Sequence, residues 1–109
     1  MKGPARNDEA AVLQAREIAR KTLDEGYDPL LACREIDGLS PGLPTIPREV
    51  LDTFNAVASE TDTIPLGDQR RYWSDDALRL RDYRAADYRA RVYEVVLADL
   101  RRLLALLGP

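Results

Sequence analysis

The sequence of 109 residues contains no histidine and only one cysteine, Cys33. Histidine is the commonest general base near neutral pH and the commonest metal ligand. Zinc sites and Cys–His nucleophiles need several such side chains together, so both are excluded for this chain. A single cysteine also forms no disulfide within the chain, which fits a reducing compartment.

Long apolar runs, basic clusters and glycine-rich phosphate loops are also missing. No run approaches the about 20 apolar residues of a membrane-spanning helix, and residues 1–7 hold no apolar signal segment. We therefore expect a cytoplasmic protein that does not contact a membrane. The 16 basic and 19 acidic residues form no basic block, so nucleic acid is not an expected partner. Without a phosphate loop, we expect no nucleotide or other cofactor.

What remains is a composition typical of a globular domain, with 45% apolar and 32% charged residues. A chain of this length predicts a single domain over residues 1–109, with residues 1–6 as a loose tail. Apolar residues recur at helical spacing, and the alternation that is typical of strands is missing. We therefore predict an all-α fold, a compact bundle of about four helices with a long C-terminal helix.

Capping residues and terminating glycines mark the first two predicted helices. Asn7 or Asp8 can cap a helix that ends at Gly26, because glycine accepts the left-handed conformation there. A second helix is predicted over residues 28–37, and Gly38 is expected to end it. A third helix opens at about residue 47, and it carries the only phenylalanine, which we expect in the centre of the core.

The last predicted helix runs from Ser74 as the N-cap to about Leu107, without proline or glycine. Asp82 and Arg89 lie on its apolar face, and charges are rarely buried. Either the first half of this helix projects beyond the core, or the two charges are paired. The second half holds more leucines than one narrow face needs, which favours a homo-oligomer: Leu97, Leu100, Leu103, Leu104, Leu106 and Leu107.

Between the last two helices, residues 59–73 depart most from helical periodicity. A hydroxyl of Ser59 or Thr61 can bond the end of the preceding helix. Gly67 can supply the positive φ of a turn, and Asp68 can cap a short helical turn after it. Much of this segment therefore has a purely structural explanation.

Trp73, the only tryptophan, ends this segment. It can be buried with its N–H bonded, or it can anchor an interface, since Trp, Tyr and Arg dominate binding hot spots. The neighbouring Arg70 favours the second interpretation. We predict a binding site for another protein at Glu60, Asp62, Arg70 and Trp73.

The carboxylates of Glu60, Asp62 and Asp68 lie close in the sequence and support an alternative. Such groups can hold Mg²⁺ or Ca²⁺ or perform acid–base catalysis. However, their spacing matches no calcium loop, and acids also start turns and helices. A carboxylate-dependent metal-binding protein or enzyme is therefore the alternative, with no catalytic residue or metal ligand assigned.

The run SETD-x-I-P-x-G-x-x-R-x-x-W over residues 59–73 resembles the signature of a family of small bacterial proteins of unknown function. Upstream, ACREI at residues 32–36 looks like the Cys-Arg helix that precedes the signature in those proteins. The resemblance covers about residues 22–80. It implies a cytosolic helical domain without an assigned activity, cofactor or catalytic residue, and immunity or antitoxin partners are common among such proteins. Together with the scarcity of catalytic side chains, it favours a non-enzymatic protein-binding module, of the immunity type or a regulatory partner of another bacterial protein.

Overall fold

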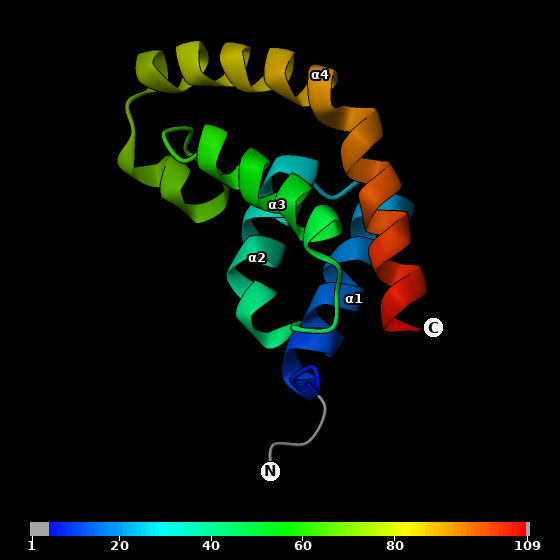
Figure 1. Cartoon of the computed structure of the whole chain (residues 1–109). Helices are drawn as coiled ribbons and strands as arrows, with labels where there is room; N and C mark the ends of the chain where they lie inside the picture. The colour runs from blue at the N-terminus through cyan, green and yellow to red at the C-terminus, as the bar shows by residue number, and fades with distance from the viewer. Residues whose placement is uncertain (1–4, 109) are drawn as a thin grey trace.

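Four α-helices and two short 3-10 helices make up the fold, for which a computed structural model describes residues 5–108 (Figure 1). In chain order they are α1 (Glu9–Glu25), α2 (Pro29–Leu39), η1 (Ser40–Gly42), α3 (Arg48–Glu60), η2 (Gly67–Tyr72) and α4 (Asp75–Leu107). No β-strand occurs in residues 5–108, so the predicted all-α class with a long C-terminal helix is confirmed. Most of the tail expected over residues 1–6 lies outside the described residues.

The predicted caps position three of the helices. The Asp8 carboxylate accepts from the backbone N–H of Ala10 at 3.2 Å and begins α1. Gly26 ends α1 with a φ of 73°, in the left-handed region. Asp28 begins α2, and Ser74 begins α4. These short polar side chains satisfy backbone N–H groups that have no partner within the helix.

Two predicted helix ends are wrong. α2 continues through Gly38 to Leu39 and passes directly into η1, because the Ser40 hydroxyl bonds the Asp37 carbonyl at 2.7 Å and keeps the backbone turning. η2 begins at Gly67, with φ 58°, so Asp68 lies inside its first turn and caps nothing.

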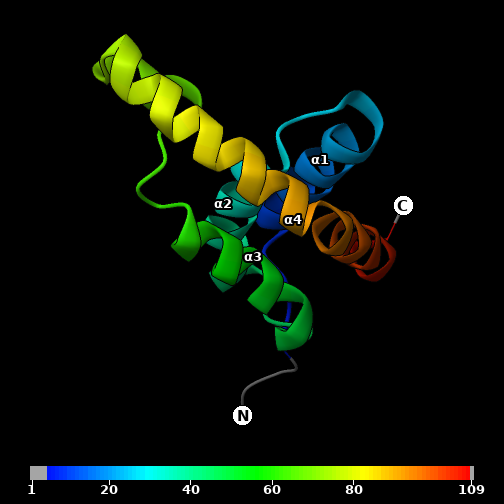
Figure 2. The ribbon, with the colours of Figure 1, turned by 90° about the horizontal axis from the view of Figure 1, so that it is seen from above.

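The apolar core forms where α2 contacts α1, α3 and α4 (Figures 1 and 2). Phe54 of α3 is fully buried within it, as predicted. Complete burial of such side chains contributes about 1.5–3 kcal/mol each. The other largest buried apolar residues are Leu30, Ile36, Leu43, Val50, Val96, Leu100 and Leu103.

Cys33 of α2 is fully buried in this core, and burial raises the pKa of its thiol from 9.0 to about 12. Since the thiolate is the reactive form, we expect no labelling of Cys33 by a thiol reagent at pH 8 in the folded protein and rapid labelling in urea. The unfolded thiol ionises first, so stability should fall as the pH rises above 9.0. Thiol titration and melting curves at pH 7 and pH 10 check both expectations, and rapid labelling of the folded chain at pH 8 would contradict them.

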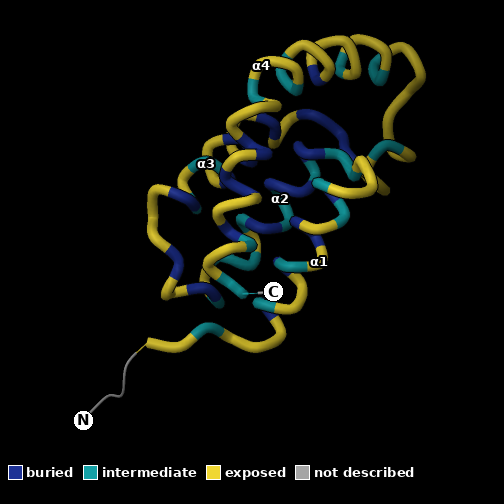
Figure 3. The backbone as a smooth tube through the Cα atoms, turned by 90° about the vertical axis from the view of Figure 1, so that its right-hand side faces the viewer, coloured by how far each residue is buried: buried dark blue, intermediate teal, exposed yellow. Residues whose placement is uncertain are grey.

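α4 is longer than the core against which it packs. Its 33 residues span about 50 Å at 1.5 Å per residue, and its buried residues begin only at Ala85. Residues 75–84, which we call the α4 arm, therefore extend beyond α1–α3, and Figure 3 shows this end with mostly exposed and intermediate positions. The arm gives the molecule its elongated shape of 56 × 26 × 22 Å.

Candidate functional site

Arg34 of α2 holds the segment between α3 and η2 in place. Its guanidinium donates to the backbone carbonyls of Thr61 and, at 3.2 Å, Ile64. It also donates to the side-chain carbonyl of Gln69 at 3.1 Å. Thr61, Ile64 and Pro65 are buried, so one arginine fixes the inner side of a segment whose outer side chains remain free.

The structural explanation of this segment is confirmed in part. The Thr61 hydroxyl donates to the Val57 carbonyl at 2.6 Å and so closes the end of α3. Gly67 adopts the predicted positive φ. Ser59 is exposed instead, because the buried Thr61 already occupies the end of the helix.

Three long-range contacts hold the first half of α4 against the rest of the fold. Arg70 of η2 makes a bidentate ion pair with Asp82, at 2.5 and 2.9 Å. The Tyr88 hydroxyl donates to the Glu60 carboxylate. Arg89 donates twice to Asp28, the cap of α2, at 3.0 and 3.1 Å. The two alternatives for Asp82 and Arg89 therefore both hold, since the arm projects and each charge is paired.

The protonation states at these contacts suit neutral pH. The hydrogen bond from Arg70 lowers the pKa of Asp82 below its ordinary 3.8, against a smaller opposing effect of burial. The stabilisation from this carboxylate is therefore present above pH 3.8 and is lost as the pH falls through the lower folded value. Burial raises the pKa of Tyr88, and its bond to Glu60 raises it further, so the phenol keeps the proton that it donates.

A concavity of about 490 Å³ lies between the segment, η2 and the arm, and we call it the Trp73 groove. Its lining residues are Asp62, Thr63, Ile64, Pro65, Gln69, Tyr72, Trp73 and Arg81. A neighbouring concavity of about 290 Å³ between α3 and α4 shares Thr63, Ile64 and Arg81 with it and adds Tyr83 and Arg84. The two concavities therefore form one hollowed surface.

Large apolar side chains are exposed around this surface. Half of the eight such residues in the described chain lie between positions 72 and 83: Tyr72, Trp73, Leu80 and Tyr83. Trp73 is 37% exposed, and its indole N–H bonds no residue among 5–108. The Arg81 guanidinium lies 5.7 Å from the centre of its ring, within cation–π range. Trp73 therefore lies at the surface rather than in the core.

The four predicted binding residues have separate positions. Asp62 and Trp73 line the same groove, while Glu60 lines the neighbouring concavity and accepts from Tyr88. Arg70 lines neither concavity and braces the arm through Asp82. Asp68 is exposed away from both. No three His, Cys, Asp or Glu side chains in residues 5–108 are grouped to hold a metal ion.

Sequence reasoning missed three residues of this site: Arg34, Gln69 and Arg81. Arg34 entered only through its place in the ACREI run, without a contact assigned to it. No sequence pattern marks Gln69 and Arg81 as site residues, because the turn between η2 and α4 breaks helical periodicity. The direction of this turn decides which α4 side chains face Trp73.

Comparison with known proteins gives no guide to the ligand of the groove. No family model, curated protein or solved structure matches this chain. Among residues 5–108, no helix combines the length and the apolar character needed to cross a bilayer. What the groove binds has to be inferred from its own residues.

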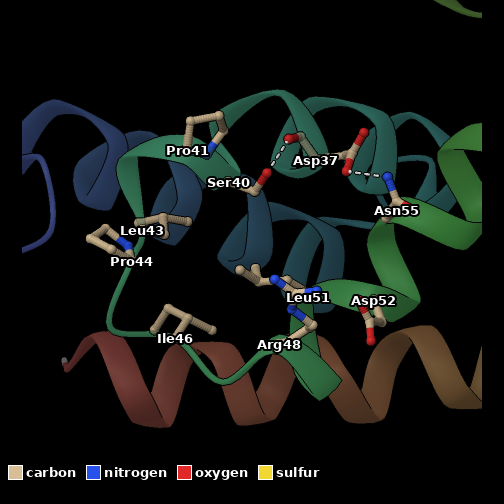
Figure 4. Close-up of a pocket in the computed structure, with 10 residues that line it drawn as sticks. All are labelled: Asp37, Ser40, Pro41, Leu43, Pro44, Ile46, Arg48, Leu51, Asp52 and Asn55. Atoms are coloured by element: carbon tan, nitrogen blue, oxygen red, sulfur yellow. Dashed lines mark hydrogen bonds between the residues drawn. The ribbon is translucent and has the colours of Figure 1, made fainter.

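A third concavity, of about 570 Å³, lies between the end of α2, the loop that includes η1 and the first half of α3 (Figure 4). Its polar side chains partly bond one another. Asn55 donates to the Asp37 carboxylate at 3.1 Å, and Ser40 donates to the carbonyl of the same residue. Leu43 and Ile46 line it but are themselves buried in the core, and its lining includes no aromatic residue.

The leucines near the end of α4 serve the core of one chain. Leu97, Leu100 and Leu103 are buried, and Leu104 and Leu107 pack against the same cluster. Leu106 alone of the six is strongly exposed, at 51%. The core therefore explains most of the residues that had favoured a homo-oligomer.

Proposed function

We propose that this chain is a non-enzymatic protein-binding module that takes its partner in the Trp73 groove. The carrying observation is that its only tryptophan is exposed in a concave site, beside Tyr72 and Arg81. Tryptophan, tyrosine and arginine contribute most to binding energy at protein interfaces. No aromatic residue lines the third concavity.

Polar contacts also organise the surroundings of the groove before a partner binds. Arg34 holds its floor through two backbone carbonyls, and the exposed Arg70–Asp82 pair links η2 to the arm that forms its wall. A site that is organised before binding loses less conformational entropy when its partner arrives. This supports recognition of a defined partner segment.

The resemblance of residues 59–73 to small bacterial proteins supports a regulatory or immunity-type role, acting on another bacterial protein. The buried, unbridged Cys33 fits a cytoplasmic location. In such a role the module acts by occupying its partner, which requires affinity and specificity but no catalytic groups.

Trp73→Ala is expected to reduce capture of the partner from a lysate of the source organism by at least about tenfold, because hot-spot side chains cost about 2 kcal/mol or more when truncated. Quantitative mass spectrometry of the captured proteins measures this. Tyr93→Ala is the matched control, since Tyr93 is an exposed aromatic residue of α4 outside both concavities. Equal capture by the two variants, or unfolding of Trp73→Ala, would refute the proposal.

A further inference from the structure

We infer that the α4 arm is a movable wall of the Trp73 groove. The arm unwinds from Ser74 towards Ala85 while the rest of the fold stays intact, and the ion pair between Arg70 and Asp82 acts as the latch that holds it closed. The opening is a property of the free chain. Its consequence for binding rests on the proposed function, because the arm contributes Arg81 to the lining of the groove.

The arm has no share in the apolar core. Within residues 75–84, no residue belongs to the buried core cluster or packs against it, and burial along α4 begins only at Ala85. Most of the stability of a protein helix comes from the packing of its apolar face. Segments with few buried apolar contacts open locally, at a much lower free energy than global unfolding. We therefore expect the arm to open before the core does.

Two side-chain contacts join the arm to η2 and to the residue that follows it. Arg70 makes its bidentate ion pair with Asp82, and the two side chains are 41% and 46% exposed. Arg81 lies over the ring of Trp73. Exposed contacts of both kinds are weak, because water competes for the charged groups. They favour the closed arm without locking it in place.

The opening is bounded on both sides. η2 stays attached to the fold, because Leu66, which precedes it, is buried. On the side of the core, Ala85 is buried, and Arg89 donates two hydrogen bonds to the cap of α2. The segment that can unwind is therefore confined to residues 75–84. Since this segment carries Arg81, its opening removes one wall of the groove and leaves the rest of the lining in place.

Amide hydrogen exchange, resolved by NMR in the full chain without a ligand, tests this inference. Amides of residues 79–84 should exchange at least about hundredfold faster than those of residues 97–103, yet more slowly than in an unstructured peptide. Arg70→Ala should speed exchange in the arm about two- to fivefold, the effect expected for an exposed ion pair, and should leave residues 97–103 unchanged. Reversing the pair, with Arg70→Asp and Asp82→Arg together, should restore most of the protection. Arg71→Ala is the matched control, since Arg71 is the neighbouring residue of η2 and its contact is with Tyr72 inside η2.

Three outcomes would overturn the inference. In the first, the arm amides exchange as slowly as those of residues 97–103, so that only global unfolding opens them. In the second, they exchange as fast as in an unstructured peptide, so that no closed state exists. In the third, Arg70→Ala has no larger effect than Arg71→Ala. The capture experiment with Trp73→Ala is a separate test: it can fail while the arm still opens, and the arm can fail to open while capture still depends on Trp73.

Discussion

Replacing Arg34 with alanine is expected to lower the free energy of unfolding by about 1–3 kcal/mol, the cost of burying an unsatisfied polar group. Arg34 bonds the backbone carbonyls of Thr61 and Ile64, and both residues are buried. Alanine leaves the Ile64 carbonyl without a donor, leaves the Thr61 carbonyl with only the backbone N–H of Ile64 at 2.9 Å, and opens a gap beneath the segment. The Trp73 groove should lose its floor, so Trp73 emission should shift before global unfolding.

Urea unfolding followed by circular dichroism and by Trp73 fluorescence tests this expectation, and a loss of 1 kcal/mol corresponds to about 4–8 °C in melting temperature. Arg34→Lys is the matched control. It keeps the charge but lacks the planar fork, in which Nη2 bonds both backbone carbonyls and Nη1 bonds Gln69, so we expect a smaller loss. If Arg34→Ala melts like the unchanged chain, Arg34 does not hold the segment.

The helices could be predicted from the sequence because their signals are local. Asp8, Asp28 and Ser74 cap helices within three residues of themselves. The contacts of Arg34 join residues 27 and 30 positions apart, and such a contact leaves no periodic trace. The error at Gly38 has a related cause, since a neighbouring hydroxyl and not the glycine decides where the backbone turns.

The candidate site could be predicted only in part, for a similar reason. Trp73 and Asp62 stand out by residue type, and they line one groove. Arg70 also stands out by residue type. Its partner Asp82 is twelve residues away on another element, so the sequence suggests a binding residue and does not reveal the ion pair that Arg70 makes with α4. Which arginine faces Trp73 depends on the direction in which α4 leaves η2.

The second large effect is expected at Asp28, whose carboxylate has two tasks. It caps α2 through the backbone N–H of Leu30 at 3.0 Å, and it accepts both bonds from Arg89 of α4. A lost N-cap costs about 1 kcal/mol, and a partly buried bidentate pair adds about 1 kcal/mol more. We therefore expect Asp28→Ala to lose about 2 kcal/mol of unfolding free energy.

Asp28→Asn separates the two tasks, because asparagine caps a helix as well as aspartate but is neutral. Asp28→Asn should lower the free energy of unfolding by about half as much as Asp28→Ala does. In a double-mutant cycle, Asp28→Asn and Arg89→Ala should show a coupling of about 0.5–1 kcal/mol, the size expected for such a pair. If the cycle gives no coupling, the pair does not hold α4. If coupling is present, both variants should also weaken the binding of ligands in the Trp73 groove. The first part of α4 forms a wall of this groove, although neither Asp28 nor Arg89 lines it.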